Sequence, residues 1–474
     1  MRLPFLKRNR EPLPDGTPAA AIHRNRGDLR IWWLYIALAI TSLIEVYSAA
    51  SAEVYRSTFI LVPLLKQGAI LALGIFVAWL IVRYVTPRHI VNATIPIIVL
   101  AFILSWAPVV LPWFGLEELA KPKNNAARWI TIPGLPDYQV SEMTKIGIVF
   151  LGAYLLPKGN VNRDLKHRYI TLWVVSALMI FPILKENGST GVMLFATVFV
   201  MSFFQLGFRS KYILRTALIA CAALVFIIGI FALLPAEAQQ SVFPRGSTWI
   251  NRFKSSNPAD DATLTAARID SLKYAVTDKN AQQQYSKMAI ARGILPQGSG
   301  NSKMRDMLPV AHADFIYPII VEELGIFGLL WIPFLYLFLF FRVSTLAIKT
   351  KNAFFSMIML GLIFVYTLQA MVNITISTGV FGDFVTGQSL PLIGKGGSSI
   401  LTMGVSFGII LVITRFMQDQ RDINRRQAQA ALAGESEAPT PEAQPVQEAE
   451  TTRVPEDDTP CCPPPQISTG TQSA

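Results

Sequence analysis

The stretch AFFSMIMLGLIFVYTLQAMVNITIS, residues 353–377, carries no charged side chain. A helix needs about 20 predominantly apolar residues to cross the hydrocarbon core of a bilayer, and this stretch is long enough to do so. Similar stretches recur before and after it along the chain. Together they predict about ten membrane spans, near residues 31–50, 68–85, 90–112, 142–157, 169–184, 189–207, 212–235, 316–341, 353–377 and 398–416.

The composition agrees with these spans. Of the 474 residues, 52% are apolar and only 15% are charged, and the mean hydropathy is +0.41. A soluble domain carries about 25% charged residues, so the composition excludes a cytosolic globular protein and a disordered one. The three cysteines do not suit a disulfide framework or a zinc site, and the four histidines argue against a metal enzyme. We therefore predict an all-α polytopic membrane protein with about ten transmembrane helices.

The distribution of charge predicts the orientation and the boundaries of the chain's parts. Residues 1–30 form a basic segment, so the positive-inside rule places the N-terminus in the cytoplasm. With ten spans the C-terminus lies on the same side. The net charge of +11 is explained by this topology and does not require nucleic acid as a partner. The membrane domain is predicted at 31–416, with one large extracytoplasmic loop at 236–312. Residues 417–474 lack aromatic side chains and predict a disordered cytoplasmic tail.

Polar residues gather at the predicted outer ends of the spans. In the first cluster, Ser141 suits the N-cap of a helix and Glu142 lies in its first turn, where a negative charge suits the helix dipole. Neither argument explains Lys145, which lies one turn inside an apolar helix and needs a partner or an anionic ligand. Arg128 and Gln139 precede this helix and complete the cluster.

Two further clusters follow along the chain. Glu322 and Glu323 are adjacent carboxylates inside an otherwise apolar span, so they must face a cavity or a cation. The glycine-rich run before the last span offers backbone amides and a lysine that suit a phosphate. The candidate binding residues in these two clusters are His312, Asp314, Glu322, Glu323, Lys395, Gly396, Gly397, Ser398 and Ser399.

Three runs of residues carry a resemblance to a known family. They are Ala127–Ile130 with Gln139-x-Ser141-Glu142-x-x-Lys145, Leu308-Pro309-x-x-His312-x-Asp314-Phe315 with Glu322-Glu323-x-Gly325, and Leu390–Ile393 with Gly396–Ser399. In this order, they resemble the SEDS family (shape, elongation, division and sporulation) of peptidoglycan polymerases. The resemblance implies a ten-helix bundle in the bacterial cytoplasmic membrane. The segment Thr386–Pro391 is most similar to the cell-division branch, which implies a location at the division septum.

The resemblance implies glycosyl transfer with lipid II, an undecaprenyl-pyrophosphate-linked disaccharide pentapeptide. In that reaction a sugar 4-hydroxyl attacks the anomeric carbon that bears the pyrophosphate of the growing strand. The hydroxyl needs a general base, and the departing pyrophosphate needs positive charge nearby. Arg128, Lys145 and Lys395 are the candidates for this second role.

The general base of the family is implied to be an aspartate early in the long outer loop. Asp261 matches the first half of the family's pattern there, and Asp278 matches the second half. At least one of them is an ordinary solvated acid, and the sequence leaves the choice open. Asn187 is an amide where the family has an acid, so no charged role is carried over to it.

The resemblance also implies a protein partner. This is a class B penicillin-binding protein, a transpeptidase, whose helix would lie against the outer half of the eighth and ninth spans, among the membrane lipids. A divalent cation, Mg²⁺ or Mn²⁺, would fit near Glu322, Glu323 or the pyrophosphate, but no ligand spacing establishes a metal site. Two other functions stay open: a lipid II flippase, which needs a polar cavity but no general base, and a non-catalytic scaffold of the division machinery.

Overall fold

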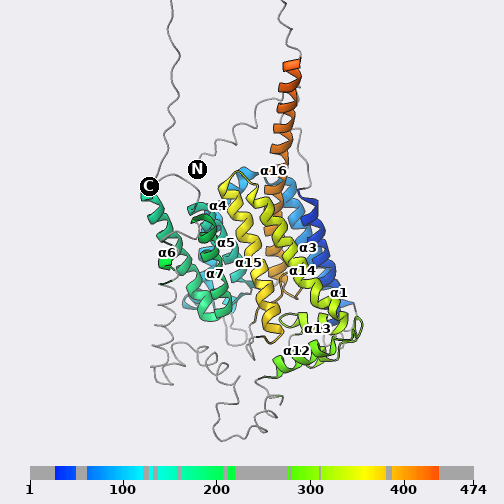
Figure 1. Cartoon of the computed structure of the whole chain (residues 1–474). Coiled ribbons are helices and arrows are strands. Elements are labelled where there is room, and N and C mark those ends of the chain that lie inside the picture. Colours follow the sequence, from blue (N-terminus) through cyan, green and yellow to red (C-terminus); the bar gives the residue numbers. More distant parts are fainter. Residues whose placement is uncertain are drawn as a thin grey trace, which may run out of the picture. The chain divides into compact units, whose positions relative to one another are not determined.

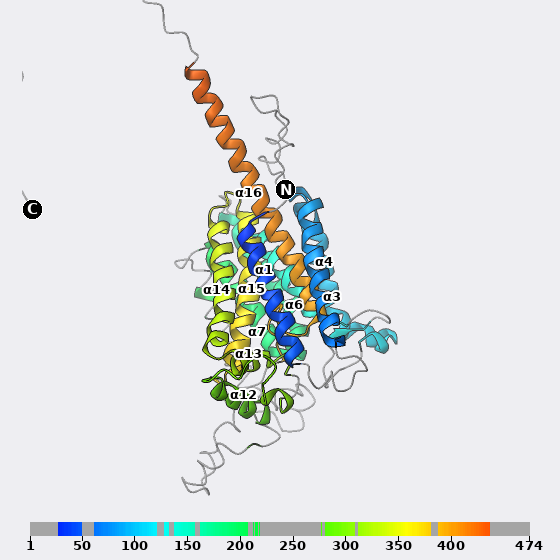
Figure 2. The ribbon, with the colours of Figure 1, turned by 90° about the vertical axis from the view of Figure 1, so that its right-hand side faces the viewer.

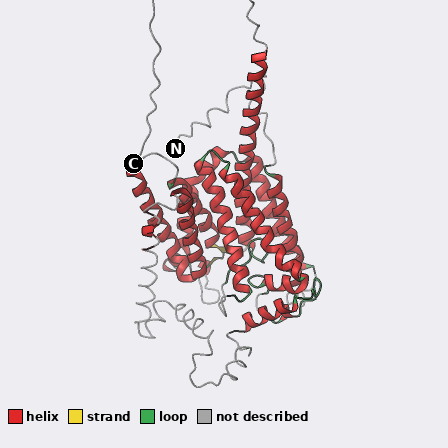
Figure 3. Cartoon of the chain, in the orientation of Figure 1, coloured by secondary structure: helices red, strands yellow, loops and turns green. Residues whose placement is uncertain are grey.

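In the computed structural model, most of the described residues are helical (Figure 3). The described residues are 27–49, 61–120, 128–131, 137–156, 162–206, 212, 214–216, 218, 276, 280–308, 311–380 and 387–436. The helices are α1 (Leu29–Ala49), α3 (Val62–Tyr84), α4 (Pro87–Val110), α5 (Val140–Leu155), α6 (Asn162–Glu186), α7 (Gly188–Leu206), α12 (Ala281–Arg292), α13 (Ile316–Leu324), α14 (Ile326–Ile348), α15 (Ala353–Ser377) and α16 (Gly397–Ser436). The 3₁₀ turns η4 (Leu111–Phe114), η5 (Glu117–Ala120) and η7 (Met304–Asp306) and an antiparallel pair of strands, β1 (Trp129–Ile130) and β2 (Tyr138–Gln139), complete the described part.

Eight of the described helices are long and apolar enough to cross a membrane. The chain is therefore a multi-pass membrane protein, as the sequence predicts. The eight segments are Leu29–Ala49, Val62–Tyr84, Pro87–Phe114, Leu165–Glu186, Gly188–Leu206, Ile326–Ile348, Ala353–Ser377 and Gly397–Gln429. The predicted fourth span corresponds to α5, which has only 16 residues, and the predicted span 212–235 lies almost entirely outside the described residues. The count of ten and the orientation in the membrane stay predictions.

The predicted span 316–341 is wrong as a single helix. The chain forms α13 and α14 instead, which are separated at Gly325 with a φ of +67°. A Cβ atom at Gly325 would lie 3.1 Å from Pro296 Cβ, so glycine permits both the left-handed backbone and the close approach of the preceding loop. Figures 1 and 2 show α13 beside α12 at one end of the bundle.

Helix α15 lies inside the bundle, where it packs on α5, α7 and α14 (Figure 1). Of its spanning segment, 72% is buried, against 22% for α4. Gly361 allows a close approach of α15 to α5, since a Cβ atom there would lie 2.7 Å from Val149 Cγ1. Side chains on α15 can therefore reach several neighbouring helices at once.

Several helices are tied together at the end of the bundle where α1 begins. Asp28 forms an ion pair with Arg342 of α14, and its backbone N–H donates to Thr414 Oγ1 of α16 at 3.1 Å. Arg415 of α16 donates from Nη2 to the carbonyl of Val85, directly after α3, at 2.9 Å. The last carbonyls of a helix lack intrahelical donors, and this arginine supplies one.

The chain divides into two units, residues 1–424 and 425–474. Helix α16 begins one residue before the predicted start at 398 but continues to Ser436. Residues 417–436 are thus helical where a disordered tail is expected from the sequence, because alanine, glutamine and arginine are good helix formers and no proline interrupts them. The remainder of the predicted tail, residues 1–26 and most of the predicted loop 236–312 lie outside the described residues.

Candidate active site

Segments far apart in the sequence meet at the end of the bundle opposite the Asp28–Arg342 pair. The backbone N–H of Gln139, in β2, lies 3.3 Å from Ser398 Oγ at the start of α16. The Nε of Arg128, just before β1, donates to the carbonyl of Glu186 at the end of α6 at 2.9 Å. The structure therefore brings together polar clusters that the sequence places at the ends of different spans.

Lys145 is buried and has partners on two helices. Its Nζ lies 2.8 Å from Oε1 of Glu142, which is also buried and lies on the same helix, and it donates to Gln369 Oε1 of α15 at 2.7 Å. The ammonium also lies 5.3 Å from the centroid of the Tyr366 ring, within the range of a cation–π contact. The partner that the sequence predicts for Lys145 is thus present within the chain, and Glu142 has a role beyond the helix dipole.

Asp314 and Arg128 both lie beside Gly387. A Cβ atom added at Gly387 would lie 3.2 Å from Arg128 Nη1 and 3.7 Å from Asp314 Oδ2. Asp314 belongs to the turn before α13, outside the eight apolar segments. Desolvation by burial raises the pKa of Asp314 to about 6, and the Arg128 guanidinium opposes this rise. A carboxylate with this pKa is ionised at neutral pH and is a better proton acceptor than an ordinary aspartate.

Two side chains of α15 fasten the loop that follows that helix. Gln369 Nε2 donates to the carbonyl of Ser389 at 3.0 Å, and Asn373 Nδ2 donates to the carbonyl of Gln388 at 2.6 Å. Neither Gln369 nor Asn373 is among the site residues predicted from the sequence. The signal that would have found them is an isolated amide side chain inside an apolar span, which needs a hydrogen-bond partner there.

The same loop is held at two further carbonyls. The Tyr336 hydroxyl of α14 donates to the carbonyl of Pro391, and Ser42 Oγ of α1 donates to that of Ile393 at 2.9 Å. Between these two points Leu392 has a φ of +65°, which is uncommon for a residue other than glycine. The hydrogen bonds on both sides hold Leu392 in this conformation, so the loop has a defined path through the bundle.

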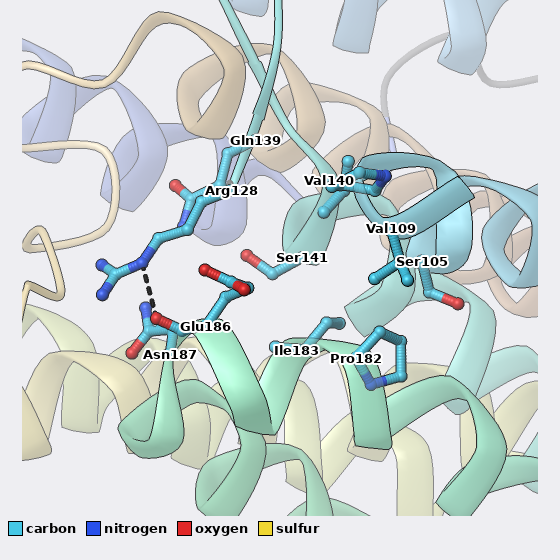
Figure 4. Close-up of a pocket in the computed structure, with 11 residues that line it drawn as sticks. Ser105, Val109, Arg128, Gln139, Val140, Ser141, Pro182, Ile183, Glu186 and Asn187 are labelled. Atoms are coloured by element: carbon cyan, nitrogen blue, oxygen red, sulfur yellow. Dashed lines mark hydrogen bonds between the residues drawn. The ribbon is translucent and has the colours of Figure 1, made fainter. Parts of the chain in front are cut away.

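A pocket of about 330 Å³, including the open space at its mouth, lies between α4, α5 and α6. Figure 4 shows Arg128, Glu186 and Ser141 on one side of it and the apolar side chains of Val109 and Val140 on the other. The Ser141 hydroxyl and the side-chain nitrogen of Asn187, which also lines the pocket, are buried without a hydrogen-bond partner among the described residues. Buried polar groups are almost always satisfied, so these two can bind a water molecule or a polar group of a ligand. The pocket is lined by Ser105, Pro108, Val109, Arg128, Gln139, Val140, Ser141, Pro182, Ile183, Glu186 and Asn187.

Glu322 is buried and receives four hydrogen bonds, one from Arg292 at the end of α12 and three from the loop between α12 and α13. Arg292 Nε and Ser302 Oγ donate to it at 2.8 and 2.5 Å, and the backbone N–H groups of Lys303 and Met304 at 3.3 Å. From the sequence, this carboxylate must face a cation or a cavity, and Arg292 is that cation. These contacts attach the loop to α13, and none of these four donors belongs to a residue that lines the pocket.

Glu323 contacts the same loop and α1. The hydroxyl of Ser48 and the backbone N–H of Gly300, at 2.8 Å, donate to its carboxylate. Among the described residues, no group of three or more His, Cys, Asp or Glu side chains is arranged to hold a metal ion. The carboxylates of Glu322 and Glu323 are already engaged by the chain, so they do not fit the role of cation ligands.

The other predicted site residues lie around the loop and the turn before α13. The backbone N–H of Lys395 donates to the carbonyl of His312 at 2.9 Å, which joins the glycine-rich run to that turn. Gly396 precedes α16, which begins at Gly397. The hydroxyl of Ser399 is buried without a partner among the described residues. Asp261 and Asp278 lie outside the described part of the chain, so the choice between them is untested.

Residues 29–419 match the family model described as Cell cycle protein, which covers FtsW, RodA and SpoVE. The chain belongs to this family. It is the SEDS family that the motifs indicate. Among its members, the probable peptidoglycan glycosyltransferase FtsW of Trichlorobacter lovleyi is 28% identical over 390 residues, which cover 82% of this chain and 93% of the relative. The FtsW of Geobacter metallireducens is 27% identical over 396 residues, which cover 83% and 96%.

Solved structures of SEDS proteins share the fold. A chain from the structure described as "Structural coordination of polymerization and crosslinking by a peptidoglycan synthase complex" matches with a TM-score of 0.57 and 19% identity, covering 82% of this chain and 98% of that one. The rod shape determining protein RodA of Thermus thermophilus matches with a TM-score of 0.53 and 19% identity, covering 82% and 97%.

Proposed function

We propose that this protein is a peptidoglycan glycosyltransferase that polymerises lipid II at the outer face of the bacterial cytoplasmic membrane, during septal cell-wall synthesis. Its membership of the SEDS family and the names of its FtsW relatives support this class of reaction. The structural observation that carries the proposal is the position of Asp314 and Arg128 beside Gly387. Arg128 also lines the pocket with the unsatisfied polar groups, which supports a role for both side chains at the substrate.

Asp314 is the general base in this proposal. The 4-hydroxyl oxygen of one sugar forms a bond to the anomeric carbon of the other, while the bond from that carbon to the pyrophosphate oxygen breaks. Asp314 accepts the hydroxyl proton, and the pyrophosphate leaves with the bonding electrons. Arg128 supplies positive charge for the departing anion, with Lys395 as a second candidate. Asp261 and Asp278 stay open as alternatives for the base.

Lys145 and Glu142 have a structural role near this site, at the start of α5. The Lys145 ammonium is held by Glu142 and Gln369, so its charge is shared within the chain. We assign to the pair the role of fixing the start of α5, which carries the unpartnered Ser141 into the pocket. Gln139 and Ser398 join this helix start to α16. No step of the reaction is assigned to Glu322, Glu323 or a divalent cation.

The test is polymerisation of lipid II by the purified protein, with Asp314→Asn beside Asp261→Ala and Asp278→Ala. We expect Asp314→Asn to lose at least 99% of the rate, since an amide accepts no proton and general bases contribute about 10²–10⁴-fold. If Asp314→Asn keeps the wild-type rate while one loop variant loses it, Asp314 is not the base. A folded wild-type protein that binds lipid II without polymerising it would favour the flippase or scaffold function.

We further propose that a class B penicillin-binding protein binds along α14. Phe327, Phe334, Phe338 and Phe341 are exposed on this helix at spacings of three, four and seven residues, so they share one face. Stacked rings continue along it, with centroids 5.6 Å apart between Phe334 and Phe338. The solved structure that matches with a TM-score of 0.57 is a peptidoglycan synthase complex in which polymerisation and crosslinking are coordinated, which supports a crosslinking partner here.

Co-purification with the transpeptidase tests this surface. We expect Phe334→Ala with Phe338→Ala to lower the recovered transpeptidase at least fivefold. The matched control is Phe76→Ala with Trp79→Ala on α3, another exposed and stacked aromatic pair, with centroids 5.8 Å apart. Equal losses in both double variants would mean that exposed aromatics act only through the lipid, and α14 would not be the binding face.

A further inference from the structure

Gln369 and Asn373 lie one turn apart on α15, and each holds two separate parts of the site. Gln369 accepts from Lys145 Nζ at 2.7 Å through Oε1 and donates to the carbonyl of Ser389 at 3.0 Å through Nε2. Both ends of this amide are therefore used, and they point to different segments. The side chain is buried, so losing either contact leaves a polar group without water to replace it.

Asn373 makes the corresponding connection to the proposed base. Its Nδ2 donates to the carbonyl of Asp314 at 2.9 Å and to the carbonyl of Gln388 at 2.6 Å. The turn before α13 and the loop after α15 are thus joined through one amide group. Gln388 in turn donates from its side chain to the Thr190 hydroxyl at the start of α7.

We infer that Gln369 and Asn373 are positioning residues that set the distance between Lys145 and Asp314 by fastening both to the loop 387–396. The inference rests on the proposed function, because it assigns these amides to the geometry of that reaction. Helix α15 is suited to this role since it is largely buried and packs on α5, α7 and α14. A rigid element that carries both amides fixes the spacing of groups that belong to different segments.

The loop itself responds to the loss of these contacts. Within it, the N–H of Gly394 donates to the carbonyl of Leu390 at 2.8 Å, and the N–H of Lys395 donates to that of His312 at 2.9 Å. These amides exchange slowly only while the loop keeps its path. The rate of hydrogen exchange in the loop 387–396 therefore reports whether Gln369 and Asn373 hold the loop in place, independently of activity.

The experiment compares Gln369→Met, Gln369→Glu, Asn373→Leu and Asn373→Ser with the control Thr375→Val. Thr375 also lies on α15, but its hydroxyl donates to the carbonyl of Met371 within that same helix. Gln369→Met removes both contacts at similar volume. Gln369→Glu keeps an acceptor for Lys145 but has no donor for Ser389. Asn373→Ser keeps a hydroxyl donor at this position. It is the second variant to measure if Asn373→Leu does not fold.

We expect Gln369→Met and Asn373→Leu to lower kcat for lipid II polymerisation at least tenfold with KM changed less than threefold. Exchange in the loop should become at least tenfold faster in both, whereas Thr375→Val should match wild type in both measurements. Gln369→Glu should share the faster exchange but retain more activity than Gln369→Met.

The inference is overturned if folded variants keep kcat within twofold of Thr375→Val, or if kcat falls while loop exchange is unchanged. Failure of the proposed function would look different. In that case the wild-type protein makes no polymer, and loop exchange alone decides: faster exchange in Gln369→Met and Asn373→Leu supports the fastening by α15, and unchanged exchange overturns it.

Discussion

Lys145 Nζ lies 2.8 Å from Glu142 Oε1, three residues earlier on α5, and neither side chain is more than 3% exposed. A buried ion pair of this kind contributes little net stability as a pair, because both charges are desolvated. Removing one partner is different, since the remaining charge then has no compensation. The pair therefore leads to a prediction about single and double variants.

Glu142→Gln should lower the free energy of unfolding by about 3 kcal/mol, because it leaves the Lys145 ammonium without its counter-charge. The double variant Glu142→Gln with Lys145→Met should recover part of this loss, since no unpaired charge is left. The measurement is unfolding in detergent, followed by helix content. If the two changes prove additive, the pair does not interact in the way that its geometry indicates.

The pKa of Asp314 predicts the pH dependence of the reaction. A general base must be ionised, so kcat/KM should fall about tenfold per pH unit as the pH drops below about 6. Arg128 lowers this pKa, so Arg128→Gln should move the acid limb of the profile to higher pH as well as lower the maximum rate. An acid limb near pH 4, unmoved in Arg128→Gln, would contradict the assignment of Asp314.

Gly387→Ala should lower polymerisation without a large loss of stability. The added methyl group would lie 3.2 Å from Arg128 Nη1, so the flexible guanidinium must move away from its place near Asp314. Because a misplacement of about 1 Å can cost up to 10²-fold in rate, we expect roughly a tenfold loss of kcat. The control is Gly68→Ala, whose methyl group would make an ordinary contact of 3.5 Å with Leu43 Cδ1, and it should retain wild-type kcat.

Glu322→Gln should loosen the loop before α13. Four donors converge on the Glu322 carboxylate, and an amide turns one accepting oxygen into a donor that faces them. We expect a loss of about 2–4 kcal/mol, because the Arg292 charge also loses its partner. Limited proteolysis within residues 292–304 measures this effect. Asp306→Asn is the control: its carboxylate is 57% exposed and lies 3.9 Å from Arg305 Nε, so it should change stability by less than about 0.5 kcal/mol.

The spans and the membrane class could be predicted from sequence because hydropathy depends on composition along one segment. The break at Gly325 could not, since Leu324 and Ile326 beside it are apolar, and the loop residues Gly293 and Pro296 that pack against it lie far away in sequence. In the same way, the helical residues 417–436 have a composition that is compatible with both helix and disorder. Local composition alone does not distinguish these cases.

The site was predictable as a set of clusters but not as a set of contacts. Lys145 is conspicuous because it is a charge in an apolar span, whereas Gln369, its partner on α15, is a neutral amide that does not stand out in the sequence. Asp314 is predicted as a binding residue, and its proposed role as the base depends on Arg128 and Gly387, which lie far from it in sequence. Such roles depend on tertiary distances.

The contacts of Asp28 and Arg415 restrict how the helices can move. Side chains there bridge the end of α3, the last turns of α14 and the middle of α16. These contacts resist sliding of the helices past one another more than they resist tilting about this level of the bundle. We therefore expect any opening of the substrate site at the opposite end to be a hinge motion, in which displacements grow with distance from Arg415.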